Sequence, residues 1–405
     1  MSICFLLLAG IASFYMAWNI GANDSANSMA SAVGAKAITF KQAVIIASVL
    51  EFLGAWLVGS HVTETIKKGI INPASIEVAK TFAIVLFSAI SGASIWVFIS
   101  TWKGLPVSTT HSIVGALVGA GLVCGGHSIV SWGKVFEIVV SWLTSPFLSG
   151  FVAFFLFRFI NKFFISTEEK IKIHRTKKYF PFFIFFTFFI VVLSFLFKTP
   201  FGKKFGFGLW KSIGISLAIS SFATIVVRFF ILKKVRIFEP ENVFKPMQII
   251  TSCYVALAHG ANDVANAIGP FAGILSIYRT GEISRRAEIS QVILAVGGIG
   301  IAIGIFTWGW KVIKTVGNNI TELTNTRGFA VDFAAATTVI IASKMGLPVS
   351  TTHAAVGAVV GIGFARGIEA LDLRVIRNIV FAWILTLPIS ALISGLIFAF
   401  CREVV

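Results

Sequence analysis

The octapeptide GLPVSTTH occurs twice in the chain, at Gly104–His111 and at Gly346–His353. A second motif, GAND, occurs twice in the same order, at Gly21–Asp24 and at Gly260–Asp263, and an Asn follows each copy three residues later. Eight identical residues repeated at one offset do not arise by chance. The chain is therefore an internal duplication, and its two halves are expected to share one fold.

Each half contains five apolar segments, and two more lie between the halves. In the first half the segments cover about 3–33, 40–60, 78–102, 106–125 and 132–160; the middle pair lies near 181–197 and 209–231; the remainder extend from about 248 to 400. Only 13% of the residues are charged, against roughly 25% in soluble domains. The sequence therefore predicts an all-α polytopic membrane protein with about twelve transmembrane helices.

An odd number of crossings in each half, joined by an even number in the linker, places the second half upside down relative to the first. Such inverted repeats are typical of secondary transporters, with broken or re-entrant helices at the midplane. We therefore expect a first repeat at 1–160, a linker with two transmembrane helices and basic loops at 161–247, and a second repeat at 248–405. The Gly-rich segments 106–125 and 348–364 either span the membrane or re-enter it.

The net charge of +17 is concentrated in the linker, where residues 161–245 hold fifteen basic and four acidic residues. These charges stand in short clusters between apolar runs, without the interleaved aromatic residues of a nucleic-acid surface. We therefore expect no nucleic-acid partner. The outermost clusters, Lys162–Lys178 and Arg228–Lys245, are expected to face the cytoplasm. The predicted location is the plasma (inner) membrane, as a multi-pass protein within the lipid bilayer.

The two GAND motifs place an ionisable residue inside an apolar segment, which is costly and usually marks an ion path. On a helix, side chains three and four positions apart share a face, and carboxylate and amide oxygens are ligands for hard cations. We therefore predict cation coordination, sodium foremost, by Asn23, Asp24, Asn27, Asn262, Asp263 and Asn266. The alternative is a polar clamp between helices.

The two GLPVSTTH motifs combine a proline suited to the first turn of a helix with three hydroxyl residues. Hydroxyls beside the free amides of a helix N-terminus form an anion site. The predicted anion ligands are Ser108, Thr109, Thr110, Ser350, Thr351 and Thr352. The alternative is that these residues only cap their own helices.

Electrostatics connects the two kinds of motif. Neither contains Lys or Arg, and two helix N-termini offer only about +0.5 charge each. A divalent oxyanion beside two ionised Asp side chains therefore requires bound cations or a protonated carboxylate. The anion then binds tightly only when its co-ions are bound as well. This thermodynamic coupling between anion and cation binding is the basis of symport.

Several further polar residues are secondary coupling candidates. Glu51 and Asp332 are acids in apolar surroundings, and they serve either as proton relays or cation ligands or as partners in helix packing. His111 and His353 end the hydroxyl motifs and titrate near neutral pH, although a structural role is the more common one. Gln42 and Gln291 are weaker candidates for the same cavity.

GANDSAN with GANDVAN, and PVSTTHSIVGA with PVSTTHAAVGA, resemble the duplicated signatures of the inorganic phosphate transporter family. The resemblance covers nearly the whole chain except the region 161–247. It implies orthophosphate transport coupled to sodium ions or protons, with phosphate bound by the two hydroxyl triplets and the co-ions by the GAND motifs. Glu51 and Asp332 match acidic positions of that family, where members often carry Glu instead of Asp332.

The sequence therefore predicts a secondary active transporter that imports inorganic phosphate by cation symport with alternating access. Sodium is the preferred co-substrate because Asn and Asp clusters suit a desolvated alkali ion, with protons as the alternative, and no other cofactor is expected. Sulfate transport and a passive anion channel are weaker alternatives. An enzyme is not expected, because no Arg stands beside the hydroxyls and no Walker-type glycine loop is present. A homodimer is left open.

Overall fold

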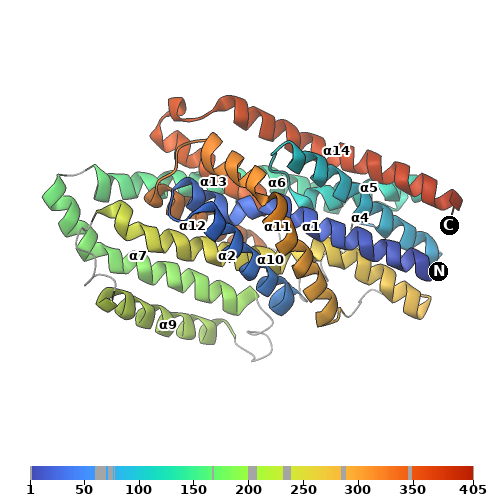
Figure 1. Cartoon of the computed structure of the whole chain (residues 1–405), viewed down its shortest axis with the longest axis horizontal. Coiled ribbons are helices and arrows are strands. Elements are labelled where there is room, and N and C mark those ends of the chain that lie inside the picture. The colour runs from blue at the N-terminus through green and yellow to red at the C-terminus, as the bar shows by residue number, and fades with distance from the viewer. Residues whose placement is uncertain are drawn as a thin grey trace.

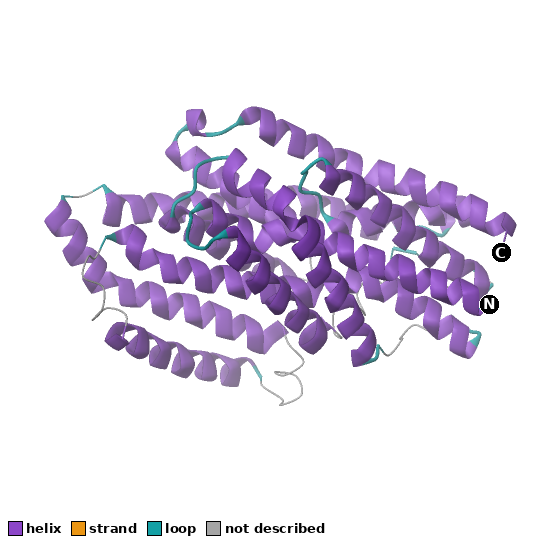
Figure 2. Ribbon diagram, in the orientation of Figure 1, coloured by secondary structure: helices purple, strands orange, loops and turns teal. Residues whose placement is uncertain are grey.

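The computed structural model describes residues 2–59, 70–71, 76, 78–166, 168–198, 208–230, 239–283, 289–344 and 349–404. Within these ranges the chain forms twelve long α-helices (Figures 1 and 2). They are α1 Ile3–Gly34, α2 Phe40–Val58, α4 Ala79–Trp102, α5 Thr109–Gly125, α6 Trp132–Ile160, α7 Glu169–Lys198, α9 Leu209–Phe230, α10 Pro240–Thr280, α11 Gln291–Lys314, α12 Asn325–Lys344, α13 Thr351–Arg366 and α14 Leu373–Val404. Nine of the described helices are long and apolar enough to cross a membrane. The predicted all-α polytopic membrane fold is confirmed.

Helices α4 and α5 form a re-entrant hairpin. Ile71, which precedes α4, forms an antiparallel bridge with Val130, which follows α5, and the amide of Ser131 donates to the carbonyl of Ile70 at 2.9 Å. The chain therefore enters and leaves this hairpin at the same end of the molecule. With 17 residues, α5 is about 25 Å long, shorter than the roughly 30 Å of the hydrocarbon layer.

Helices α12 and α13 form a second hairpin that enters from the opposite end (Figure 1). The amide of Asp372, after α13, donates to the carbonyl of Ile320, before α12, at 3.0 Å. The first turns of α5 and α13 approach each other in the bundle, where the rings of His111 and His353 lie 4.4 Å apart between centroids. The short length of α5 and the meeting of the hairpins inside the bundle favour re-entry over spanning for α5 and α13. Three full-length helices remain in each half, still an odd number, so the inverted arrangement is retained.

The central helices pack across the two halves, and glycines permit their close approach. A Cβ on Gly21 of α1 would run into the carbonyl of Ile301 in α11, and a Cβ on Gly260 of α10 would run into the carbonyl of Glu51 in α2. Each GAND helix therefore packs directly against the second helix of the other half. The repeats 1–160 and 248–405 interlock and do not form two separate bodies.

The hairpins pack in the same exchanged manner on the outer helices. A Cβ on Gly119 of α5 would meet the backbone of Ala391 in α14, and a Cβ on Gly361 of α13 would meet the backbone of Gly150 in α6. Small residues that allow backbones to approach closely are the usual basis of helix packing in lipid. Each hairpin is thus covered by the last helix of the opposite repeat.

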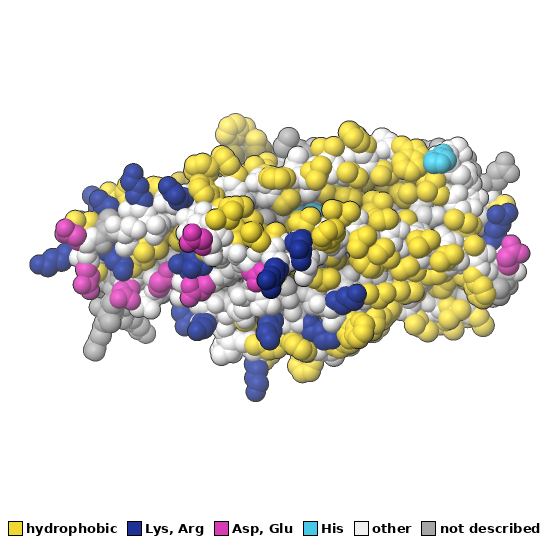
Figure 3. All heavy atoms as spheres, turned by 90° about the horizontal axis from the view of Figure 1, so that it is seen from above, with side chains coloured by type: hydrophobic (Ala, Val, Ile, Leu, Met, Phe, Trp, Pro, Cys, Tyr) yellow, Lys and Arg dark blue, Asp and Glu magenta, His cyan; other side chains and the backbone are white. Residues whose placement is uncertain are grey.

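The linker contributes α7 and α9 at one side of the bundle, where α9 packs mainly on α7 (Figure 1). Lys and Arg side chains gather at one end of the molecule together with most of the acidic side chains, while apolar side chains cover the other part of the visible face (Figure 3). This distribution is that of a protein whose apolar surface contacts lipid.

Candidate functional site

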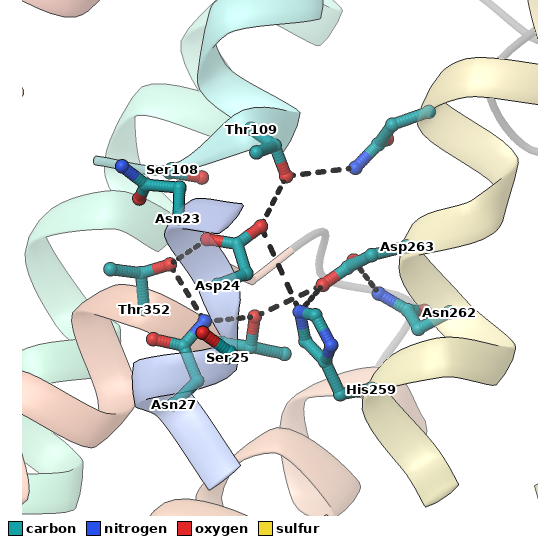
Figure 4. Close-up of polar contacts among 12 residues, drawn as sticks. Asn23, Asp24, Ser25, Asn27, Ser108, Thr109, His259, Asn262, Asp263 and Thr352 are labelled. Carbon is teal, nitrogen blue, oxygen red and sulfur yellow. Dashed lines mark hydrogen bonds and ion pairs between the residues drawn. The ribbon is translucent and has the colours of Figure 1, made fainter. Parts of the chain in front are cut away.

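The hairpin tips meet the middles of α1 and α10, where the two GAND motifs lie (Figure 4). The motif residues Asp24 and Asp263 are each about 1% exposed. Helix α1 is buried without interruption from Asn19 to Ala32. The duplicated motifs, which lie far apart in the sequence, therefore converge in the interior of the bundle.

The carboxylate of Asp24 accepts one hydrogen bond from each hairpin. The hydroxyl of Thr109 in α5 donates to Oδ2 at 2.7 Å, and the hydroxyl of Thr352 in α13 donates to Oδ1 at 3.1 Å. The hydroxyl of Thr351 approaches Asp263 Oδ2 at 3.4 Å. Both hydroxyl motifs and both aspartates thus belong to one polar cluster.

The asparagines that follow the GAND motifs connect each half to the hairpin of the other half. Asn27 donates to Thr352 at 3.0 Å and to Thr351 at 3.4 Å, and Asn266 donates to Thr110 at 3.1 Å and to Thr109 at 3.3 Å. The same relationship is made twice, as the inverted repeat requires. The amide oxygen of Asn27 is buried without a partner among the described residues.

Ser108 and Ser350 cap the helices that begin at the site. Their hydroxyl oxygens accept from the amides of His111 and His353, each at 3.2 Å. The free N–H groups of the first turns of α5 and α13 therefore lie at the hairpin tips, where a helix N-terminus favours an anion. The serines cap their own helices, as the alternative interpretation had it, whereas the threonines bond to the aspartates and asparagines.

Asn23 contacts the first hairpin tip through its side-chain amide. Its amide nitrogen donates to the hydroxyl of Thr101 at 2.9 Å and to the carbonyl of Leu105 at 3.0 Å, and its oxygen accepts from the amide of Val107 at 3.0 Å. Both ends of the side chain therefore secure the first hairpin tip. Cation coordination by Asn23 stays a prediction, and these contacts give the side chain a structural role as well. Its counterpart Asn262 donates to Asp263 Oδ1 at 2.8 Å.

His259 lies at the centre of the acidic residues, and the sequence interpretation missed it. Its Nε2 is 2.6 Å from Asp263 Oδ2 and 3.7 Å from Asp24 Oδ2, while its Nδ1 is 2.9 Å from Glu51 Oε2. The missed signal is a single His directly before the second GAND. The corresponding position before the first GAND is Ile20, so the comparison of the two halves did not select it.

Glu51 is fully buried and joins the cluster through His259. The hydroxyl of Ser28 donates to Glu51 Oε1 at 3.1 Å. In the part of the chain that the structure describes, His259 is the one basic side chain paired with Asp24, Glu51 or Asp263. Three carboxyl groups thus share a single imidazole.

Asp332 forms a second polar cluster beside the first. Its Oδ1 accepts from the hydroxyl of Ser31 at 2.6 Å, and its Oδ2 accepts from Ser252 at 2.6 Å, Gln248 at 3.0 Å and Thr251 at 3.3 Å. Ser28 and Ser31 lie on one face of α1 and contact Glu51 and Asp332 respectively. Sequence interpretation selected Asp332 but not its four partners.

The other predicted candidates lie outside the two clusters. The His111 ring stacks on Trp142 at 3.6 Å between ring centroids, the His353 ring stacks on Trp383 at 3.7 Å, and the two imidazoles meet edge to face at 4.4 Å. Gln42 is exposed and completes a capping box with Thr39 at the start of α2. Gln291 is exposed at the first position of α11.

A small cavity of about 50 Å³ opens beside the first cluster. Asn27, His259, Asn262 and Thr351 form its polar end, and Tyr254 together with apolar residues of α10, α12 and α13 forms the remainder. The carboxylate and imidazole atoms of Asp24, His259 and Asp263 lie within 4.8 Å of one another. Hydroxyl, amide and carboxylate groups thus converge at a site that suits a small ion.

Comparisons of sequence and of structure both match this chain to phosphate transporters. The sequence model of the phosphate transporter family matches residues 20–394. A phosphate permease homologue from Pyrococcus furiosus is 48% identical, covering 97% of this chain and 95% of its own length. Inorganic phosphate transporter 2-1, chloroplastic, from Arabidopsis thaliana is 39% identical, covering 94% of this chain and 69% of its own. A solved structure of "the sodium-dependent phosphate transporter" superposes with a TM-score of 0.90 at 44% identity, covering 99% of this chain and all of that one.

Proposed function

The chain belongs to the phosphate transporter family, and we propose on that premise that it imports orthophosphate together with sodium ions by alternating access. Its relatives and its fold are those of transporters and not of enzymes, which confirms the prediction that it is not an enzyme. Phosphate is the substrate supported by the family.

The main support for sodium symport is that the carboxylate of Asp24 accepts a hydrogen bond from each of the two hairpins. The threonine hydroxyls available to an oxyanion already donate to this carboxylate. A phosphate ion at the same hydroxyls therefore comes next to a buried negative charge. The two helix N-termini supply only about +0.5 charge each, so cations have to accompany the anion into the site.

Oxygen atoms suitable for sodium surround this position. Asp24 and Asp263 supply carboxylate oxygens, and Asn27 supplies an amide oxygen that is buried and unpartnered among the described residues. Asn262 and Asn266 both lie on α10, where Asn262 donates to Asp263 and Asn266 donates to Thr110 of the first hairpin. A hard cation prefers oxygen ligands of these kinds. The name of the 44% identical structure, which specifies sodium dependence, supports the same co-ion.

The Asp332 cluster is the proposed place of a further co-ion. It brings one carboxylate together with the hydroxyls of Ser31, Thr251 and Ser252 in a fully buried position. The cluster is connected to the first one through α1. A cation here would add to the positive charge that draws phosphate into the site.

The inverted hairpins provide the proposed route for alternating access. Each hairpin opens to a different end of the molecule, and each is bonded at its tip to both GAND helices. Movement of one hairpin away from α1 and α10 would expose the cluster to one side only. Exchange between the two arrangements is the alternating-access cycle of inverted-repeat transporters.

Selectivity for phosphate over sulfate follows from hydrogen-bond chemistry. Phosphate carries protons at neutral pH and can donate to Asp24 or Asp263, whereas sulfate would face the carboxylate as a bare anion. A site with an unmatched buried carboxylate discriminates strongly against such an analogue.

The proposed location is the plasma membrane, with the basic end in the cytoplasm.

Uptake into proteoliposomes tests the proposal. Phosphate accumulation is measured under an imposed inward sodium gradient, with a proton ionophore present, and then under a proton gradient without sodium. Sodium-driven accumulation is expected in the first condition and none in the second. The reverse result would establish proton coupling, and phosphate currents far above transporter turnover would establish a channel.

A further inference from the structure

An apolar groove of about 530 Å³ lies between the linker helices and the central helices of the bundle. Side chains from α7 and α9 and from α2 and α10 line it. Most of these side chains are half-buried, and Ile219 of α9 is 43% exposed. Helix α9 packs mainly on α7 (Figure 1). The groove therefore opens to the surface of the molecule beside the linker.

The groove lies at the depth of one leaflet of the bilayer. Helix α9 begins at Leu209, and the next residue, Trp210, is 81% exposed, as is typical of an aromatic residue at a membrane interface. Ile215 and Ile219 of the groove lie about 9 and 15 Å from Leu209 along the helix, within the roughly 15 Å of one hydrocarbon leaflet. Water does not fill an apolar cavity, because it finds no polar partners there. In a membrane, an acyl chain therefore occupies the groove.

Positive charge stands at the interface end of the groove. Lys211 is exposed and lies one helical turn before Ile215, on the same face of α9. Helix α7 ends at Lys198, and the sequence contains no acidic residue between these two lysines. A lysine at a helix end extends its ammonium group to the lipid headgroups. This end of the groove thus complements a negatively charged headgroup, and one Lys near such headgroups strengthens binding about 5-fold.

The other ends of α7 and α9 adjoin the basic clusters Lys162–Lys178 and Arg228–Lys245, which are expected to face the cytoplasm. Since each of the two helices crosses the bilayer once, the interface end of the groove belongs to the outer leaflet.

We propose that the groove binds one anionic phospholipid of the outer leaflet, with an acyl chain along Ile215 and Ile219 and the headgroup beside Lys211. The groove is separate from the residues proposed to bind phosphate and sodium. Tyr254 of α10 connects the two places, because it lines both the groove and the 50 Å³ cavity beside His259. The bound lipid therefore packs against a wall of the transport site.

Retention of lipid by the purified full chain tests this inference. The protein is reconstituted with equal amounts of phosphatidylglycerol and phosphatidylcholine and extracted in detergent, and the mass of the intact complex is measured. The wild type is expected to retain one phosphatidylglycerol per chain, about 5-fold in preference to phosphatidylcholine. Lys211→Ser is expected to lose this preference, whereas Ile219→Trp, which fills the groove, is expected to retain neither lipid.

Arg228→Ser is the matched control, because Arg228 is exposed near the other end of the same helix. It is expected to retain phosphatidylglycerol as the wild type does. Equal losses in Lys211→Ser and Arg228→Ser would attribute retention to basic charge in general and overturn the inference. A wild type that retains no lipid, or both lipids equally, overturns it as well. A dimeric complex without lipid would assign the groove to a second copy of the chain instead.

Photo-crosslinking of the wild-type chain gives an independent test that requires no variant. A phosphatidylglycerol with a diazirine on its acyl chain is added to phosphatidylcholine vesicles that contain the protein, and the labelled residues are identified by mass spectrometry. Labelling is expected within 191–196, 215–219 and 250–257 and is expected to be displaced by unlabelled phosphatidylglycerol. Phe147 of α6, which is 77% exposed, reports contact with the surrounding lipid. Labelling at Phe147 with none in the groove contradicts the inference.

Discussion

Asn27 in α1 donates a hydrogen bond of 3.0 Å to the hydroxyl of Thr352 in α13, a residue 325 positions further along the chain. The matching bond joins Asn266 in α10 to Thr110 in α5 at 3.1 Å. Each GAND helix therefore secures the hairpin of the opposite half. Each hairpin tip is thus in direct contact with the helix that carries the aspartate of the opposite half.

This symmetry predicts equal effects of two substitutions. Asn27→Ala and Asn266→Ala each remove the bonds to one hairpin, and a hydrogen bond contributes about 0.5–1.5 kcal/mol. We expect both variants to raise the KM for phosphate by roughly 5- to 30-fold at fixed sodium. Uptake in proteoliposomes measures this, with Asn242→Ala, at an exposed position of α10, as the control. A large effect at one asparagine alone would mean that the two contacts are not equivalent.

Asn23 secures the first hairpin tip through both ends of its side-chain amide. Asn23→Ala is therefore expected to lower the free energy of unfolding by about 1–3 kcal/mol, seen as a lower melting temperature. The sodium concentration for half-maximal uptake should not change. An increased sodium requirement at an unchanged melting temperature would instead support Asn23 as a cation ligand.

Asp24 combines negative charge with hydrogen bonds from both hairpins. Asp24→Asn keeps the shape and loses the charge that brings sodium, so phosphate uptake is expected to fall by roughly 100-fold or more, and the preference over sulfate should disappear. The control is Asp372→Asn, because Asp372 is exposed and caps α14 through the amides of Arg374 and Val375. Unchanged uptake and selectivity in Asp24→Asn would remove Asp24 from the mechanism.

The Asp332 cluster has a matched control within the duplication. Ser252 donates to Asp332 at 2.6 Å, whereas Ser13, at the corresponding position of α1, donates to the carbonyl of Ala267 at 3.0 Å. Ser252→Ala is expected to raise the half-saturating sodium concentration by roughly 10-fold, since hydrogen bonds to charged groups contribute about 1.5–3 kcal/mol. Ser13→Ala should leave it unchanged. Equal responses of the two serine variants would limit Asp332 to helix packing.

Close helix contact at Gly21 predicts a stability effect. A Cβ there would collide with the carbonyl of Ile301, whereas a Cβ on Gly133 would meet nothing within 4 Å. Gly21→Ala is expected to destabilise the protein by about 1–3 kcal/mol through overpacking, and Gly133→Ala to be neutral or slightly stabilising. Thermal unfolding in detergent compares them. Equal melting temperatures would show that α1 and α11 separate without cost.

The duplication in the sequence predicted which residues gather, but not which half supplies each partner. Asn27 and Asp24 were expected near a hydroxyl motif because both motifs repeat. Their contacts with Thr352 of the other half depend on how the hairpins cross, which no local pattern records. Asn23 shares a helix with Asp24 and yet turns toward the hairpin loop, because consecutive side chains on a helix point in different directions.

Two of the residues that sequence interpretation missed have no polar counterpart in the other half. His259 corresponds to Ile20, and Gln248 corresponds to Ala9. A search for repetition selects symmetric positions, whereas these two polar residues make the site asymmetric. Their partners, Glu51 and Asp332, were selected because an acid in an apolar segment is costly in itself.

Because each hairpin packs on a helix of the other repeat, the first hairpin waits for its packing partner until the end of the chain is synthesised. Helix α5 ends at Gly125, and the helix that covers its glycine face, α14, begins at Leu373. At about 5–20 residues per second, the ribosome needs roughly 12–50 s to make the residues between them. The glycine face of α5 therefore remains without its packing partner α14 until the last helix emerges. The helix packing of the first half is completed only when translation ends.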